Sequence, residues 1–194
     1  MKTLFTGEGK MLAVMVAVAC VLTGCQSPKA MSPSGSSAVQ STRNNCYSLL
    51  HQLLDQQKNV DLLRFIKREE DDVKRLVVKI AANSAAGAKL LEEFARHEPP
   101  INLEDIRLPP GEAATREAIA STKKKELLGQ TGGEFELTLL LTQTAALSYA
   151  WHLAKVAGET EVQPERAHAV VGISEDMRKL YQEVFELLLA KTKS

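Results

Sequence analysis

The stretch that decides the fold is "LTLLLTQTAALSYAWHLA", residues 137–154, which contains no Asp, Glu, Lys or Arg. Its length is close to the roughly 20 residues that a helix needs to cross a bilayer. Polar residues are nevertheless spread along it, namely Thr138, Thr142, Gln143, Thr144, Ser148 and His152. Hydroxyl groups inside a helix can bond carbonyl oxygens one turn back. We therefore expect residues 133–157 to form a central, buried helix of a bundle, with Phe135, Tyr149 and Trp151 as core residues.

The segment that follows has the pattern of one amphipathic helix, from about residue 164 to residue 191. Apolar residues recur on one face at helical spacing: Val170, Met177, Leu180, Tyr181, Val184 and Leu188. Pro164 fits the first turn of a helix, where a missing N–H costs nothing. This segment is predicted to be the last long helix.

A long connection precedes the central helix. Prolines at positions 99, 100, 109 and 110 bracket the loop "PPINLEDIRLPPGE", and "GQTGG" at residues 129–133 breaks the chain again. The residues between them, about 112 to 128, have a weak apolar stripe and a basic run at 123–125. We expect a short extra helix there.

Residues 44–98 carry the remaining helical signal. There is neither Gly nor Pro between Asn44 and Ala86, and apolar residues recur with the spacing of an amphipathic helix. One continuous helix would be about 75 Å long, too long for a compact domain. We therefore expect a tight turn near "REEDD", residues 68–72, with Asp71 or Asp72 capping a second helix. A single long helix with the acidic run as its solvated face is the alternative.

These segments predict an all-α fold for residues 45–194. It is a four-helix bundle with a long connection and a short extra helix between the second and third long helices. This topology occurs in ferritin-like folds.

The N-terminal part predicts two segments outside the bundle. Lys2 and Lys10 precede an apolar run at residues 11–22, which at 12 residues is too short to span a bilayer. These are the parts of a secretory signal peptide. Residues 26–44 contain six serines and two prolines, a composition that cannot offset the entropy of ordering. We expect residues 25–44 to be a flexible tether.

The signal ends in "LTGC", residues 22–25, which resembles the lipobox of bacterial lipoproteins. The resemblance implies that residues 1–24 are removed and that Cys25 carries the lipid; several acyl chains hold a protein stably on a membrane. Gln26, rather than Asp, implies the outer membrane and a domain that faces the periplasm. An ordinary secretory signal with a coincidental cysteine is the competing interpretation.

Charge and cysteine content argue against two classes of protein, nucleic-acid-binding proteins and disulfide-rich proteins. Without residues 1–24 the chain has 22 basic and 23 acidic residues, so we expect no nucleic-acid partner. Cys46 is then the one cysteine left besides Cys25, which rules out a disulfide framework. We expect Cys46 to be a small buried residue, with an intermolecular disulfide as the alternative.

The mature part resembles a ferritin-like domain family of unknown function from the bacterial envelope. The matching stretches are "VDLLRFIKRE" at 60–69, "DDVKRLVVKIAANSAAGAKLLEEFA" at 71–95, "LPP" at 108–110 and "LLGQTGGEFELTLLLTQ" at 127–143. The resemblance covers about residues 45–190 and depends on helix order and apolar spacing.

The family's metal-ligand positions are not retained. The family typically has Asp-His in its second and third helices and a His in its fourth. These positions fall on Asn83-Ser84, Ala146-Leu147 and Lys179, none of which is a good metal ligand. We therefore expect no cofactor.

One weak set of alternative metal ligands is present. A di-iron bundle uses Glu-x-x-His on two helices, and here "ERAH", Glu165 to His168, has that spacing. Glu69 would lie near the centre of the first stripe if that helix were continuous. The competing interpretations are a surface Glu-His pair in a first helical turn and a solvated acidic turn.

Motifs of other chemistries are missing: there is no Gly-x-Ser-x-Gly, Walker or dinucleotide-binding pattern. The prediction is a lipid-anchored envelope protein that acts by binding or as a structural module, not as an enzyme. Its partners would be the membrane and an envelope protein, which would contact a groove between helices or the loop 99–111. The alternatives are a divergent ferritin-like metal or redox protein and a carrier of a small apolar ligand.

Overall fold

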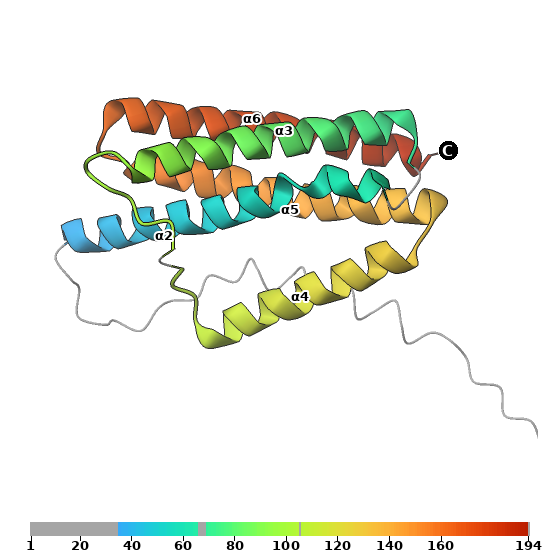
Figure 1. Cartoon of the computed structure of the whole chain (residues 1–194), viewed down its shortest axis with the longest axis horizontal. Helices are drawn as coiled ribbons and strands as arrows, with labels where there is room; N and C mark the ends of the chain where they lie inside the picture. Colours follow the sequence, from blue (N-terminus) through green and yellow to red (C-terminus); the bar gives the residue numbers. More distant parts are fainter. Residues whose placement is uncertain (1–34, 66–68, 105, 194) are drawn as a thin grey trace, which may run out of the picture. The chain divides into compact units, whose positions relative to one another are not determined.

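The structure is a computed structural model that describes residues 35–65, 69–104 and 106–193. The elements are α2 (Gly35–Gln57), the 3-10 helix η1 (Val60–Phe65), α3 (Asp71–Ala95), α4 (Pro110–Gly129), α5 (Gly132–Thr160) and α6 (Pro164–Lys191). No strand occurs in the described ranges, and residues 36–194 form one compact unit. The predicted all-α helical bundle is confirmed (Figure 1).

The charge-free stretch lies in α5, and most of its large apolar residues are buried or half-buried, except Leu141, which is 57% exposed. Phe135, Leu139, Leu140 and Leu147 are at most 1% exposed, and the amide of Gln143 is buried among them. Two of the threonines do bond carbonyl oxygens one turn back: Thr142 Oγ1 donates to Thr138 O at 2.8 Å, and Thr144 Oγ1 to Leu140 O at 2.7 Å. Among the described helices, none is both long and apolar enough to span a membrane.

Helices α5 and α6 form a closely packed antiparallel hairpin. A Cβ atom added to Gly158 would lie 2.9 Å from Val171 Cγ2, so the glycine allows this close approach. The Ser174 hydroxyl of α6 donates to the Trp151 carbonyl of α5 at 3.2 Å. The boundaries of α6 agree with the predicted 164–191, and those of α5 extend the predicted 133–157 by a few residues.

The first two helices are separate, and α3 begins at Asp71, within the turn predicted at 68–72, but the break is longer than predicted and already starts at Lys58. α2 ends at Gln57, and η1 intervenes before α3 begins at Asp71. Neither Asp71 nor Asp72 is the N-cap: this position is Glu70, which makes no side-chain capping bond. The alternative of one continuous helix is wrong because Lys58 and Asn59 form a turn. The apolar spacing continued through η1, since Val60 and Leu63 still pack on the core.

α2 begins at Gly35, inside the segment 25–44 for which the composition predicts a tether. Residues 37–42 are exposed, and Arg43 is the first buried residue. The Ser-rich composition did not reveal that the chain is already helical from Gly35. Residues 25–34, the rest of the predicted tether, lie outside the described residues.

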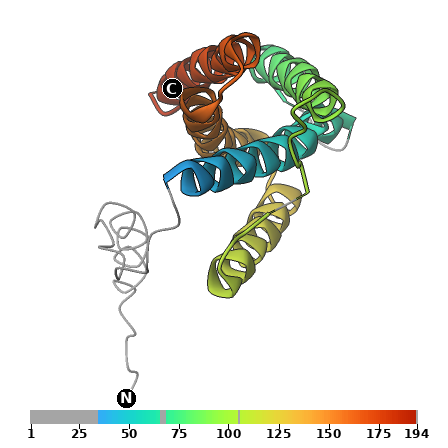
Figure 2. The same ribbon diagram turned by 90° about the vertical axis from the view of Figure 1, so that its left-hand side faces the viewer.

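The predicted short helix is α4, and it buries no residue. Figures 1 and 2 show it apart from the other helices except near its C-terminal end. The core is instead supplied by α2, α3, α5 and α6, with Ile101 added from the α3–α4 loop. Cys46 is 8% exposed within this core and is free, as predicted, and burial raises the pKa of its thiol.

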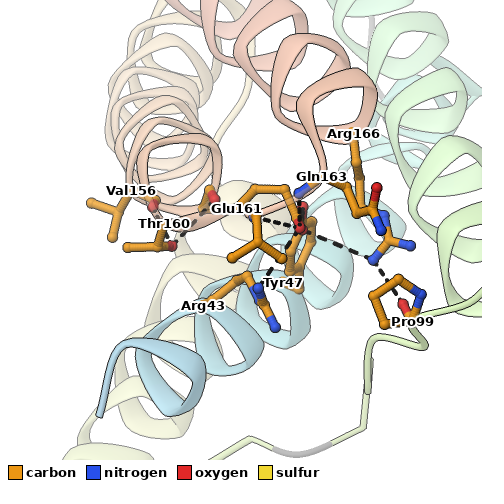
Figure 3. A network of polar contacts seen from close by, with 10 residues as sticks. Arg43, Tyr47, Pro99, Val156, Thr160, Glu161, Gln163 and Arg166 are labelled. Carbon is orange, nitrogen blue, oxygen red and sulfur yellow. Dashed lines mark hydrogen bonds and ion pairs between the residues drawn. The ribbon is translucent and has the colours of Figure 1, made fainter. Parts of the chain in front are cut away.

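A polar network closes one end of the bundle (Figure 3). The Glu161 side chain, which is fully buried, follows α5 and accepts a hydrogen bond from Tyr47 of α2 at 2.7 Å. Arg43 of α2 and Arg166 of α6 lie 3.7 and 3.9 Å from its oxygens. Arg166 also donates to the carbonyl oxygen of Pro99 at 2.9 Å. The network therefore joins α2, the loop after α3, and both helices of the α5–α6 hairpin.

A second polar network closes the other end. Lys191, in the last turn of α6, donates to Glu70 at 2.7 Å and to Glu136 of α5 at 3.0 Å, and lies 3.3 Å from Asp72 of α3. The backbone N–H of Glu70 donates to Glu136 at 2.6 Å. Burial alone would lower the pKa of Lys191, but the bonds to three carboxylates raise it. α4 supplies no residue to either network.

Candidate functional site

A cleft of about 620 Å³ lies between α2, α4 and α5, and it is the candidate site. α2 contributes Leu49, Gln52, Leu53 and Gln56, α4 contributes Ala113, Arg116, Glu117 and Ala120, the loop contributes Ile106 and Leu108, and α5 contributes Tyr149. Within α2 and within α4 the residues have i, i+3, i+4, i+7 spacing, which places each set on one helical face. The cleft is therefore bounded by two helical faces, each two turns long.

The loop wall of the cleft is held in place by α2. The Ser48 hydroxyl, which is fully buried, donates to the carbonyl oxygen of Asn102 at 2.7 Å, and the Asn45 side chain donates to that of Arg107 at 3.4 Å. Ile101 is buried in the core just before this segment. These contacts fix the backbone on both sides of Leu103 and so position Ile106 and Leu108.

Arg116 is the main polar contact between α4 and α5. Its Nε donates to Glu112 at 2.6 Å, and its Nη1 donates to the Tyr149 hydroxyl at 2.8 Å. The guanidinium carbon also lies 4.8 Å from the centre of the Tyr149 ring, in a cation–π arrangement. Burial alone would lower the pKa of Arg116, but the bonds to Glu112 and Tyr149 raise it. A positive group thus stays at the wall of a mostly apolar cleft.

The structure does not bring the predicted metal-site residues together. Glu165 and His168 are exposed in the first turn of α6, whereas Glu69 is half-buried just before α3. Lys191 marks the end of α6 that lies beside the start of α3. The distance along α6 from Glu165 to Lys191 is roughly 40 Å at 1.5 Å per residue. These three residues cannot share one metal ion, and no group of three or more potential ligands occurs among the described residues.

The positions on which the sequence resemblance would place metal ligands differ in their surroundings. The Asn83 amide donates to its own helix at Lys79 O, and Lys179 is an exposed partner of Asp176. Ser84 is fully buried, and its hydroxyl has no hydrogen-bond partner among the described residues. Cys25, the predicted lipidation site, lies outside the described residues.

The sequence predicted a groove between helices or the loop 99–111 as the contact surface, but not the residues that line the cleft. Tyr149 was expected in the core and is instead half-buried at the cleft. Arg116 and Ala120 do not belong to any recognisable sequence motif. The available signal was the spacing of Ala113, Arg116, Glu117 and Ala120, but a face that mixes two small and two charged residues is typical of a solvated helix.

Comparisons with known proteins do not identify the chain: no protein-family model matches it, and neither a curated protein nor a solved structure does.

Proposed function

We propose that this protein is a lipid-anchored, non-catalytic binding module of the bacterial envelope and that the cleft between α2, α4 and α5 is its binding element. The observation that carries the proposal is the cleft itself. Its volume of about 620 Å³ falls within the roughly 300 to 1,000 Å³ of small-molecule sites. Its lining is mostly apolar with a few polar groups, as in such sites.

The placement of the domain is part of the same proposal. The lipobox-like "LTGC" ending at Cys25, behind a short apolar run, supports lipidation and an outer-membrane anchor facing the periplasm. Growth with an alkyne-tagged palmitate should label the protein. Cys25→Ser should abolish the label and Cys20→Ser should not. Labelling that survives Cys25→Ser would contradict the anchor.

We also propose a ferritin-like kinship for the bundle. Supporting it is the helix order, in which α2 and α3 precede, and α5 and α6 follow, a long connection that carries α4. One such connection characterises ferritin-like bundles. The metal or redox alternative gains no support from these residues, because Glu165 and His168 lie near the start of α6, whereas Glu69 lies beside its other end, next to Glu70, which binds Lys191.

Carriage of a small apolar ligand is the second candidate, and the volume of the cleft favours it. The predicted place for such a ligand was the core beside α5. The cleft touches α5 only through Tyr149 and lies outside the core. An envelope protein that contacts the rim, including the loop 99–111, is compatible with either function.

The test is binding of the neutral fluorescent probe N-phenyl-1-naphthylamine to residues 26–194, which contain the whole compact unit Ser36–Ser194. We expect a saturable rise in fluorescence. Ala120→Trp should fill the cleft and abolish the rise, whereas Ala118→Trp, also exposed on α4 but outside the cleft, should leave it unchanged. Equal binding by both variants would refute the cleft as the binding element.

A further inference from the structure

α4 is a long helix of which the bundle covers little. It spans 20 residues and buries none of them, and Ile119 on it is 56% exposed. Exposed residues line the cleft on both of its helical walls: Gln52, Gln56, Ala113, Glu117 and Ala120. Solvent therefore reaches both walls, so the cleft is accessible to a second macromolecule.

The α4 wall of the cleft has a symmetric order of side chains. Ala113 and Ala120 lie equally far from the point midway between Arg116 and Glu117. The order is therefore small, charged, charged, small in either direction along the helix, and the two charges have opposite signs. If a second α4 lies antiparallel against this wall, Ala113 faces the partner's Ala120 and Arg116 faces the partner's Glu117. Each contact occurs twice, as in a two-fold interface between identical chains.

The charges and sizes on this wall suit such a pairing. Arg116 has N–H groups beyond the two that Glu112 and Tyr149 accept from. Glu117 is exposed and forms no ion pair with another described residue. Charge pairs across an interface fix its register more than they add affinity. The alanines on either side allow the two helices to approach closely, because the distance between helix axes depends on the side chains at the contact.

The opposite face of α4 suits the other wall of the cleft. Its residues have i, i+4, i+7, i+11 spacing and are all small: Gly111, Thr115, Ala118 and Thr122. A partner helix that turns its alanine face toward α4 presents this second face to α2. There Leu49 and Leu53 would pack on small side chains, and the amides of Gln52 and Gln56 would lie opposite threonine hydroxyls. The order of helices is then α2, the partner's α4, α4 and the partner's α2.

We propose that the cleft receives α4 of a second copy of this chain, and that each copy of a two-fold dimer inserts its α4 into the cleft of the other. This inference rests on the proposed function, for which it names the partner. The mixed lining of the cleft is accounted for, since the charged residues face their counterparts on the partner and the leucines face small residues.

The first test is disulfide crosslinking between two variants of residues 26–194. Ala113→Cys and Ala120→Cys are mixed, one of them with a longer tag, and oxidised with copper phenanthroline. A mixed dimer should form, because the two positions face each other across the axis. Ala113→Cys mixed with Ala118→Cys is the matched control, since position 118 lies on the opposite face of α4. Cys46 is buried and free in both mixtures. Equal crosslinking in the two mixtures would overturn the inference.

The second test is sedimentation velocity of the same chain without cysteine substitutions. Dilute protein should be monomeric, and dimer should accumulate toward about 1 mM, because small interfaces bind weakly. Glu117→Lys should weaken the dimer at least about ten-fold, because it sets a second cation opposite the partner's Arg116. Glu175→Lys, the same change at an exposed position on α6, should have no effect. Equal dimer content of these two variants would refute the pairing.

Binding of N-phenyl-1-naphthylamine separates this inference from the proposed function. The probe and the partner helix compete for the cleft, so the apparent affinity of the probe should fall as the protein concentration rises. If the chain binds the probe but stays monomeric at every concentration, the inference alone fails. If it neither binds the probe nor forms a dimer, both proposals fail.

Discussion

At the scale of single residues, Glu161 is a buried charged group that connects α2 and α6. Its carboxylate is buried against Tyr47, Arg43 and Arg166, and it also accepts from the backbone N–H groups of Val162 and Gln163. Burial alone would raise the pKa of Glu161, but the bonds from Gln163, Tyr47 and Val162 and the charge of Arg43 lower it. The ionised form is therefore the form that the folded chain stabilises.

Glu161→Gln should lower the free energy of unfolding at pH 7 by about 2 kcal/mol, since hydrogen bonds to a charged group contribute more than neutral ones. Urea denaturation followed by circular dichroism measures the change. Glu159→Gln is the control: its ion pair with Lys155 is exposed, and the expected change is below about 0.5 kcal/mol. Equal effects of the two substitutions would contradict the assigned role.

The same carboxylate predicts a pH dependence. Because the pKa of Glu161 is lowered in the folded state, its contribution is complete above the unfolded-state value, about 4.3 for a glutamate. It is lost as the pH falls through the lower, folded value. The difference in stability between the wild type and Glu161→Gln should shrink as the pH falls below about 4.3. A difference that stays constant down to pH 2 would refute this.

Ser84 is a residue whose replacement should stabilise the fold. Its buried hydroxyl has no partner among the described residues, and an unsatisfied buried group costs about 1 to 3 kcal/mol. Alanine also has the higher helix propensity. We expect Ser84→Ala to raise the free energy of unfolding by about 1 kcal/mol. The exposed Ser121→Ala on α4 reports the propensity effect alone, and equal gains would show that the buried hydroxyl costs nothing.

At the scale of elements, helix boundaries were predicted accurately where the helix buries apolar residues and poorly where it does not. The boundaries of α6 match the expected ones because a regular apolar face and Pro164 define that helix. The end of α2 was predicted too late in the sequence because Val60 and Leu63 of η1 pack on the core, so apolar residues keep helical spacing across the break. The start of α2 was missed because residues 37–42 are exposed, and an apolar pattern marks only those helical residues that pack against a core.

α4 should be the least protected helix in hydrogen exchange. It buries no residue, and Arg116 is its main polar contact with α5. We expect its amides to exchange faster than those of α3, α5 and α6, because exchange reports local opening. Arg116→Ala should increase exchange in α4 and leave the other helices unchanged. Mass spectrometry on peptides resolves the helices, and slow exchange throughout α4 would contradict the expectation.

At the scale of the whole molecule, the sequence predicted the all-α bundle but not which segments line the cleft. The cleft exists because α4 stands away from α2, and this separation depends on loop geometry that leaves no periodic signal. Its lining combines residues from four separate segments, and none of these segments contains a sequence motif that indicates a binding site. Glu69, Glu165 and His168 were grouped by residue type, and distance along α6 separates them.

Because α4 is absent from both end networks, we expect the bundle to persist when the chain is cut within α4. A protease that cuts after Lys123, Lys124 or Lys125, all exposed, would leave one fragment with α2 and α3 and another with α5 and α6. Buried leucines and the networks around Glu161 and Lys191 still join these fragments. We expect brief trypsin treatment to yield two pieces that co-elute at neutral pH and separate in urea. The protein would then be a natural split domain, which two separately expressed halves should reconstitute.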